Sequence, residues 1–200
     1  MPPVQRCGDD DFAAGSGVSG GVFDGVDEVT AWALRAQRGD PVAEAAFVRA
    51  TQAEVWRLCA ALVDPGAADD LAQEAYLRAF RALAAFEVRA SARTWLLGIA
   101  RRTCADHLRV VVRRRRLEQR LAAEAMVAGT PAPPPDGVGS ADLIASLPAE
   151  RRSAFVLTQL LGLSYAEAAE VEGVPVGTIR SRVARARTDL AADVLKAMAA

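Results

Sequence analysis

Apolar residues recur at the three- and four-residue intervals of amphipathic helices from Asp27 onward. The first helix is predicted to begin near Asp27 and to end at Gly39, because glycine readily takes the left-handed conformation that closes a helix. Asp40 followed by Pro41 then predicts the cap and first-turn proline of a long second helix. The inward side of that helix is expected to consist of Phe47, Val48, Thr51, Val55, Leu58, Cys59 and Leu62.

Two further helices are predicted between residues 65 and 109. The first follows a Pro-Gly break and carries Asp69 and Asp70 in its first turn, where acidic groups favour the helix dipole. Its apolar side includes Leu71, Ala75 and Leu83. Ser91 is expected to cap the second of these helices, whose candidates for burial are Trp95, Leu96, Ile99 and Leu108. Trp95 could instead be a stacking platform for a base, but a tryptophan on an apolar helix face is more often a core residue.

The C-terminal part of the chain is predicted to start at Ser140 with a short helix over residues 142–147. A turn at Leu147-Pro148 leads into a second helix, and its core is expected to contain Phe155, Leu157, Leu160, Leu161 and Leu163.

Residues 162–187 have the punctuation of a helix-turn-helix. Ser164 and Glu167 form a capping box, in which the hydroxyl and the carboxylate satisfy free amides at the start of a helix. Gly173 ends that helix, and Pro175 suits the first position of the next, where its missing N–H costs nothing. A turn this short joins two helices at a steep angle.

The second helix of this motif is predicted to bury one side and to present arginines on the other. Residues spaced by three and four form the buried stripe, namely Val176, Ile179, Val183, Ala186 and Leu190. Away from it lie Thr178, Ser181, Ala184 and Arg185, with Arg182 nearby and Arg180 and Arg187 at the edges. Arginine pairs in a bidentate manner with a guanine edge or grips a phosphate, so this face predicts DNA binding. The alternative is a solvated basic face on an ordinary surface helix.

Composition and charge agree with a helical protein that meets nucleic acid. Of the 200 residues, 52% are hydrophobic and only 6% aromatic, which favours closely packed short helices and an all-α fold. The net charge is -1, but residues 1–34 carry six acidic groups against one arginine, whereas residues 93–120 carry nine arginines against two acidic groups. This segregation, rather than the sum, is typical of a protein with a basic binding surface.

The pattern predicts two small helical domains joined by a flexible linker, the second being the helix-turn-helix. Residues 1–26 lack a helical period and are expected to be a disordered extension, or alternatively a partner-binding tail. The first domain is predicted over 27–111, the linker over 112–139 and the second domain over 140–195. The linker contains four successive arginines and a segment rich in proline and glycine, which suits passage near nucleic acid or a generic solvated connection.

Several classes of function are disfavoured by the sequence. Cys7, Cys59 and Cys104 are far apart, so neither a disulfide framework nor a zinc site is predicted, and no other metal or cofactor is expected. No catalytic grouping is recognisable, so the chain is expected not to be an enzyme. No apolar run is long enough to cross a bilayer, and the acidic N-terminus is unlike a signal peptide, which predicts a cytoplasmic protein without membrane insertion.

One stretch gives a specific family resemblance. The string D-D-L-x-Q-E-x-[FY]-L-R-A-[FW] from Asp69 resembles the polymerase-binding segment of the ECF (extracytoplasmic function) sigma factors of the sigma-70 family. The same family carries a helix similar to PVGTIRSRVARAR about a hundred residues later, as this chain does. The resemblance implies promoter recognition together with core RNA polymerase, and it assigns core binding to Asp69, Asp70, Leu71, Gln73 and Glu74.

The resemblance also implies two contacts with promoter DNA. The melted -10 element, as single strand, would lie against Arg89, Ser91, Arg93, Arg101, Arg102 and Arg109, with the loop at residues 86–92 capturing an unstacked base. The double-stranded -35 element would be contacted by Thr178, Arg180, Ser181, Arg182, Ala184, Arg185 and Arg187. Among these, Arg180, Ser181 and Arg185 are expected to read base edges, and Thr178, Arg182 and Arg187 to hold phosphates. An anti-sigma factor as a further partner follows only from the habit of the family.

Two other interpretations stay open at this point. The chain could be a stand-alone helix-turn-helix regulator, which would bind DNA by itself, usually as a dimer on a palindrome. It could also be an enzyme or adaptor built on an alanine-rich helical bundle, although the missing catalytic grouping argues against the enzyme.

Overall fold

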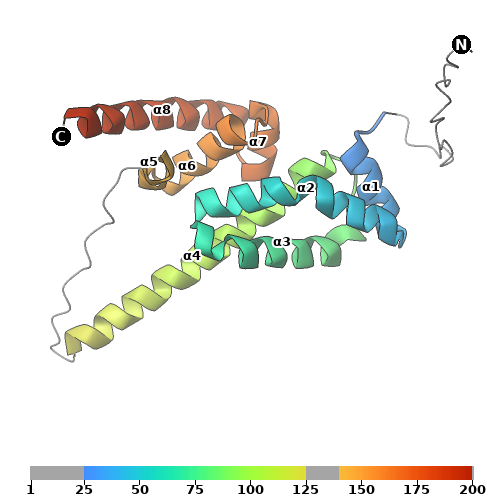
Figure 1. Ribbon diagram of the computed structural model, residues 1–200, viewed down its shortest axis with the longest axis horizontal. Coiled ribbons are helices and arrows are strands. Elements are labelled where there is room, and N and C mark those ends of the chain that lie inside the picture. Colours follow the sequence, from blue (N-terminus) through green and yellow to red (C-terminus); the bar gives the residue numbers. More distant parts are fainter. Residues whose placement is uncertain (1–24, 125–139, 200) are drawn as a thin grey trace, which may run out of the picture.

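The computed structural model describes residues 25–124 and 140–199 (Figure 1). The N-terminal half, residues 25–124, contains α1 (Glu28–Gln37), α2 (Pro41–Leu62), the 3-10 turn η1 (Pro65–Ala67), α3 (Ala68–Leu83) and α4 (Ala92–Glu124). The C-terminal half, residues 140–199, contains α5 (Ser140–Ser146), α6 (Ala149–Phe155), the π-helical turn η2 (Val156–Leu160), α7 (Tyr165–Glu172) and α8 (Val176–Ala199). These residues include no strand, so the predicted all-α fold is confirmed. Residues 1–24 of the predicted extension and 125–139 of the predicted linker lie outside the described residues.

Side-chain caps fix the starts of the first two helices where the sequence predicts them. Asp27 caps α1, and the carboxylate of Asp40 accepts hydrogen bonds from the amides of Val42 and Ala43 at 2.9 and 3.1 Å. The amide of Ala43 and the guanidinium of Arg35, 2.6 Å away, lower the pKa of Asp40.

The core of the N-terminal half follows the predicted periodicity closely. On α2, Phe47, Thr51, Val55, Leu58, Cys59 and Leu62 are buried, and only Val48 of the expected set is half-buried. Leu71, Ala75 and Leu83 of α3 are also buried, as are Leu96 and Ile99 of α4. Leu108 is half-buried because α4 leaves the bundle as it proceeds, and Trp95, near the start of α4, is half-buried because it borders a cavity.

Two residues expected in the core of the C-terminal half are exposed instead. Leu160 is 41% exposed because the π-helical turn adds a residue to the helix, which turns Leu160 outward while Leu161 and Leu163 remain buried. Val176 is 39% exposed because α8 starts to pack only with Ile179, one turn later. Phe155 is half-buried, and the expected burial of Leu157 is confirmed.

Helix α4 continues well beyond the boundary predicted at residue 111. It is a single helix of 33 residues, so residues 112–124, expected to begin a flexible linker, are helical. No glycine or proline lies between Gly98 and Gly129, and arginine, leucine, alanine and glutamate all favour a helix, so nothing in this stretch breaks it. The C-terminal part of α4 projects away from the other helices (Figure 1).

The two halves pack against each other, an arrangement that the sequence left open. Helix α7 lies against α4, and buried residues of both halves form one continuous core. A small residue at position 98 suits this approach, because a Cβ there would already be in ordinary contact, 4.0 Å from the backbone of Val171 in α7, which leaves little room for a longer side chain. Arg152 of α6 also reaches across and donates to the carbonyl of Leu62 at the end of α2, at 3.3 Å.

Candidate nucleic-acid and polymerase interfaces

The helix-turn-helix is positioned by the capping box that the sequence predicts. The hydroxyl of Ser164 accepts from the amide of Glu167 at 3.2 Å, and the carboxylate of Glu167 accepts from the amide of Ser164 at 2.8 Å. These bonds to Ser164 lower the pKa of Glu167. Gly173 closes α7 with a φ of 67°, a value that favours glycine and explains the sharp turn into α8.

The rotation of α8 agrees with the predicted wheel after its first turn. Ile179, Val183 and Ala186 are buried against α6 and α7. Five of the residues expected to face the -35 element are exposed, namely Arg180, Ser181, Ala184, Arg185 and Arg187, while Thr178 is half-buried. Arg185 and Ser181 border a shallow cavity of about 420 Å³ beside the start of α6. The exposed face is therefore basic, with small residues between its arginines.

Arg182 differs from the other arginines of this face. Its side chain is only 17% exposed and forms ion pairs with Glu150 at 2.5 Å and with Glu172 at 3.4 Å. In this conformation the guanidinium is engaged inside the C-terminal half, so a phosphate contact would require it to leave these carboxylates.

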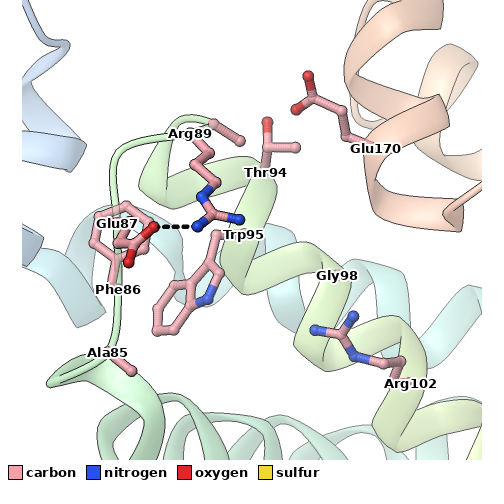
Figure 2. Close-up of a pocket in the computed structure, with 10 residues that line it drawn as sticks. Ala85, Phe86, Glu87, Arg89, Thr94, Trp95, Gly98, Arg102 and Glu170 are labelled. Atoms are coloured by element: carbon pink, nitrogen blue, oxygen red, sulfur yellow. Dashed lines mark ion pairs between the residues drawn. The ribbon is translucent and has the colours of Figure 1, made fainter.

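A second surface surrounds the loop between α3 and α4. The loop borders a cavity of about 380 Å³, in whose wall the rings of Phe86 and Trp95 pack at a centroid distance of 4.8 Å (Figure 2). Trp95 thus packs on the core, as predicted, and also faces the cavity. Arg89 is 85% exposed and pairs with Glu87 at 2.5 Å, and exposed Arg102 lies on the opposite side of the cavity.

Helix α1 holds both ends of this loop in place. Gln37 donates to the carbonyls of Leu83 and Phe86 at 2.8 and 3.1 Å, where the loop begins. The hydroxyl of Thr30 accepts from the amide of Ala92 at 2.9 Å, where the loop ends. Sequence analysis missed both residues, because a glutamine and a threonine on a short helix give no signal of a distant partner.

Two of the arginines expected at the -10 element point toward partners on other helices. Arg93 donates to Glu54 of α2 at 2.7 Å and to the carbonyl of Leu161 at 2.7 Å, and the hydrogen bond to Glu54 raises the pKa of Arg93. Arg101 donates to Glu172 of α7 at 2.8 and 3.1 Å. Ser91, by contrast, is the cap of α4, accepting from the amide of Thr94 at 3.1 Å.

Glu172 is the centre of the charged contact between the halves. Its side chain is 0% exposed and accepts hydrogen bonds from Arg101, Arg182 and the hydroxyl of Ser153. A carboxylate buried with cationic partners is costly to leave unpaired. Nothing in the local sequence pattern predicts this role for Glu172, because it depends on the packing of α7 on α4.

The third surface, at the start of α3, divides into exposed and buried residues. Asp69, Asp70 and Gln73 are exposed, and the indole N–H of Trp56 donates to Asp69 at 2.9 Å. Leu71 is only 6% exposed, so it supports this surface from below rather than contacting a partner. Glu74 is half-exposed and pairs with Arg78 at 2.7 Å.

The described residues offer little else that could carry chemistry. They contain no group of three histidine, cysteine, aspartate or glutamate side chains that could hold a metal ion. Cys59 and Cys104 are buried free thiols, and the hydrogen bond between them, together with burial, raises the pKa of Cys59. No described helix has the length and apolarity to cross a membrane.

Comparison with known protein families matches both halves. The model of Sigma-70 region 2 matches residues 47–115, and that of Sigma-70, region 4 matches residues 141–190. The ECF RNA polymerase sigma factor SigC of Mycobacterium tuberculosis is 53% identical over 167 residues, which cover 82% of this chain and 90% of that protein. The chain belongs to the ECF sigma factors. The sigma-E factor of Escherichia coli K12 is 36% identical over 166 residues, covering 76% of this chain and 87% of that protein.

Solved structures agree with this assignment. The sigma factor RpoE of Bartonella quintana, in complex with the anti-sigma factor NepR, is 26% identical and has a TM-score of 0.57, covering 74% of this chain and 94% of that one. CnrH, in complex with the cytosolic domain of CnrY, shares the fold with a TM-score of 0.65 at 24% identity, covering 86% of this chain and 99% of that one. This sigma factor is therefore a transcription initiation factor that directs RNA polymerase to specific promoters.

Proposed function

We propose that this sigma factor docks on core RNA polymerase through the start of α3, binds the melted -10 element beside the α3–α4 loop, and reads the double-stranded -35 element with α8. The observation that carries the proposal is the exposed face of α8, whose rotation is set by the buried Ile179, Val183 and Ala186. The chain itself performs no chemistry and acts in the cytoplasm with the polymerase.

On α8, exposure and position on the helix together divide the predicted contacts into two classes. Arg180, Ser181 and Arg185 are exposed, which supports base readout in the major groove. Arg187 donates to Gln159 at 2.7 Å and lies at the edge of the face, which suits a phosphate contact. Thr178 and Arg182, both less exposed, are assigned to phosphates, and Ala184 leaves room for close approach of the helix.

At the -10 element, the loop cavity is the place for an unstacked base. Phe86 and Trp95 supply an aromatic wall, and Arg89 and Arg102 supply cationic groups on two sides, which is the combination that single-stranded DNA binding uses. Arg109 extends this surface along α4, and Ser91 supports it by capping the helix. Arg93 and Arg101 join it only after they exchange their carboxylate partners for phosphates.

The docking surface for core polymerase consists of Asp69, Asp70, Gln73 and Glu74, with Leu71 supporting it from the core. The relative from Bartonella quintana binds an anti-sigma factor. We include an anti-sigma factor among the partners of this chain on that basis.

Reversal of the two exposed acidic charges tests the assignment. The double variant Asp69→Arg plus Asp70→Arg should weaken capture of core polymerase and abolish transcription from a promoter that core alone cannot use. The effect should shrink at high salt, because exposed charges are screened over about 10 Å at 0.1 M. A matched control is Arg57→Glu plus Arg81→Glu, which changes exposed charges elsewhere on the N-terminal half.

Unchanged affinity for core in the Asp69 and Asp70 variant would contradict the docking surface. A wild-type chain that never associates with core, and instead binds a palindromic DNA site as a dimer, would favour a stand-alone regulator.

A further inference from the structure

The arm of α4, residues 109–124, carries its arginines in an ordered way. At roughly 100° per residue, five arginines of α4 fall within a sector of about 60°. We call them the basic stripe, and they are Arg102, Arg109, Arg113, Arg116 and Arg120. Their successive spacings are seven, four, three and four residues, so they form one continuous row about 27 Å long.

The basic stripe is exposed and poorly neutralised. Arg102, Arg109, Arg113, Arg116 and Arg120 are all exposed, and Arg109 alone among them has an ion pair with a described residue, Asp106. Arg114, which lies on another side of the helix, pairs instead with Glu118 at 2.8 Å. Like charges three and four residues apart on a helix repel one another, so a row of this kind is stabilised by a polyanionic partner.

We propose that the basic stripe is a binding site for the phosphates of double-stranded DNA. Its arginines rise by about 4.5–6 Å from one to the next over spacings of three and four residues, so the row of about 27 Å can face several phosphates of a strand, which carries one charge per 3.4 Å of helix axis. The arm contains no aromatic residue, and single-stranded binding surfaces use aromatic side chains to stack bases. A straight, rigid row of arginines therefore favours a duplex.

The position of the stripe indicates which part of the DNA it meets, and this step rests on the proposed function. Arg102 borders the cavity beside the α3–α4 loop, where the melted base is assigned. From there the stripe leads away from the cavity along the projecting end of α4 (Figure 1). It would hold the duplex next to the melted -10 element without reading its sequence. The match to Sigma-70 region 2 ends at residue 115, so Arg116 and Arg120 lie beyond it.

The chain offers a matched pair of variants for the test. Arg113→Gln plus Arg116→Gln removes two charges from the stripe, whereas Arg114→Gln plus Arg115→Gln removes two neighbouring charges from other sides of the same helix. Glutamine keeps nearly the helix propensity of arginine, so both variants should retain the arm, which circular dichroism would verify. The probe is a fluorescent random-sequence duplex of about 20 base pairs, with a single strand of equal length for comparison, since each phosphate contact contributes to affinity whatever the sequence.

Binding is measured by anisotropy between about 50 and 200 mM salt with the full-length chain alone, because the arm is exposed without polymerase. The Arg113 and Arg116 variant should lower the salt slope for the duplex by about two and weaken its binding, since each phosphate contact contributes about 0.9. The Arg114 and Arg115 variant should bind the duplex as the wild-type chain does.

Three results would overturn the inference. Equal losses in both variants would mean that only net charge matters. A loss on the single strand as large as that on the duplex would mean that the stripe does not select double-stranded DNA. Unchanged duplex binding with reduced capture of core polymerase in the stripe variant would assign it to a protein partner. The anisotropy assay contains no polymerase, so it tests only the basic stripe. The proposed function is tested separately, by whether the wild-type chain captures core polymerase.

Discussion

The two long basic helices, α8 and α4, present their arginines from different surroundings. On α8, buried Ile179 and Val183 fix which side faces solvent, and carboxylates hold Arg182. On α4, packing against the bundle ends near Leu108, and beyond Arg109 the arm presents exposed arginines that form no ion pair with another described helix. A helix held by a core can place a side chain against one base edge, whereas a projecting helix is suited to phosphates of any sequence.

Shortening an apolar side chain on each helix should expose this difference most strongly. Ile179→Ala removes a side chain that is 0% exposed, so the free energy of unfolding should fall by about 2–5 kcal/mol. Leu117→Ala on the arm, where Leu117 is 58% exposed, should change it by less than about 0.5 kcal/mol. Urea denaturation followed by circular dichroism measures both. Similar losses for the two variants would mean that the arm is packed in solution.

Gly98 lies in the packed part of α4, where this helix meets α7. Gly98→Leu should push α7 away and cost about 1–3 kcal/mol of the contact between the halves, because overpacking strains a close approach. Gly98→Ala is the control, since its Cβ would meet neighbours at 3.8–4.0 Å, an ordinary contact, and alanine favours the helix. Energy transfer between dyes on α2 and α8 reports the separation. An unchanged distance in the leucine variant would contradict this account of the contact.

Base readout should distinguish Arg185 on α8 from Arg116 on α4. Arg185→Ala should cost about 1–3 kcal/mol of promoter binding and flatten the preference at one or two adjacent positions of the -35 element. Arg116→Ala and Arg187→Ala should weaken all sequences alike and lower the salt slope by about one. Competition among promoters with single-base changes separates the two outcomes. A uniform loss for Arg185→Ala would mean that α8 is rotated differently in its groove.

The smallest expected effect concerns the cap that positions α8. The folded-state pKa of Glu167 is lowered, so its contribution to stability is present above its unfolded pKa, about 4.3, and is lost as pH falls through the folded value. Glu167→Gln should therefore remove a part of the acid sensitivity, on the order of 0.5–1 kcal/mol as for other caps. Unfolding free energies between pH 3 and pH 6 would show this. An identical pH profile for the two proteins would rule out a contribution from Glu167.

Sequence by itself determined the helices, the capping box at Ser164, the buried Ile179, Val183 and Ala186 of α8 and the family, because these depend on neighbours within a few turns of one helix. Leu190, also expected in the buried stripe, is half-buried. It was wrong about Leu160 and Val176, since a π-helical turn and the start of packing depend on other helices. It also placed the beginning of a linker where α4 is continuous, because the four successive arginines were assigned to the linker together with the segment rich in proline and glycine, although no residue between 112 and 124 breaks a helix.

Only the tertiary structure decided which of the arginines predicted to contact DNA are held by carboxylates of the protein itself. Arg93 and Arg101 look like other exposed arginines in the sequence, yet Glu54 and Glu172 bind them from other helices. Glu172 is separated from Arg101 by 71 positions in the chain, and a carboxylate and a guanidinium so far apart give no local pattern. Their pairing follows from the packing of α7 against α4, where small residues such as Gly98 allow the helices to approach and desolvation makes an unpaired carboxylate costly.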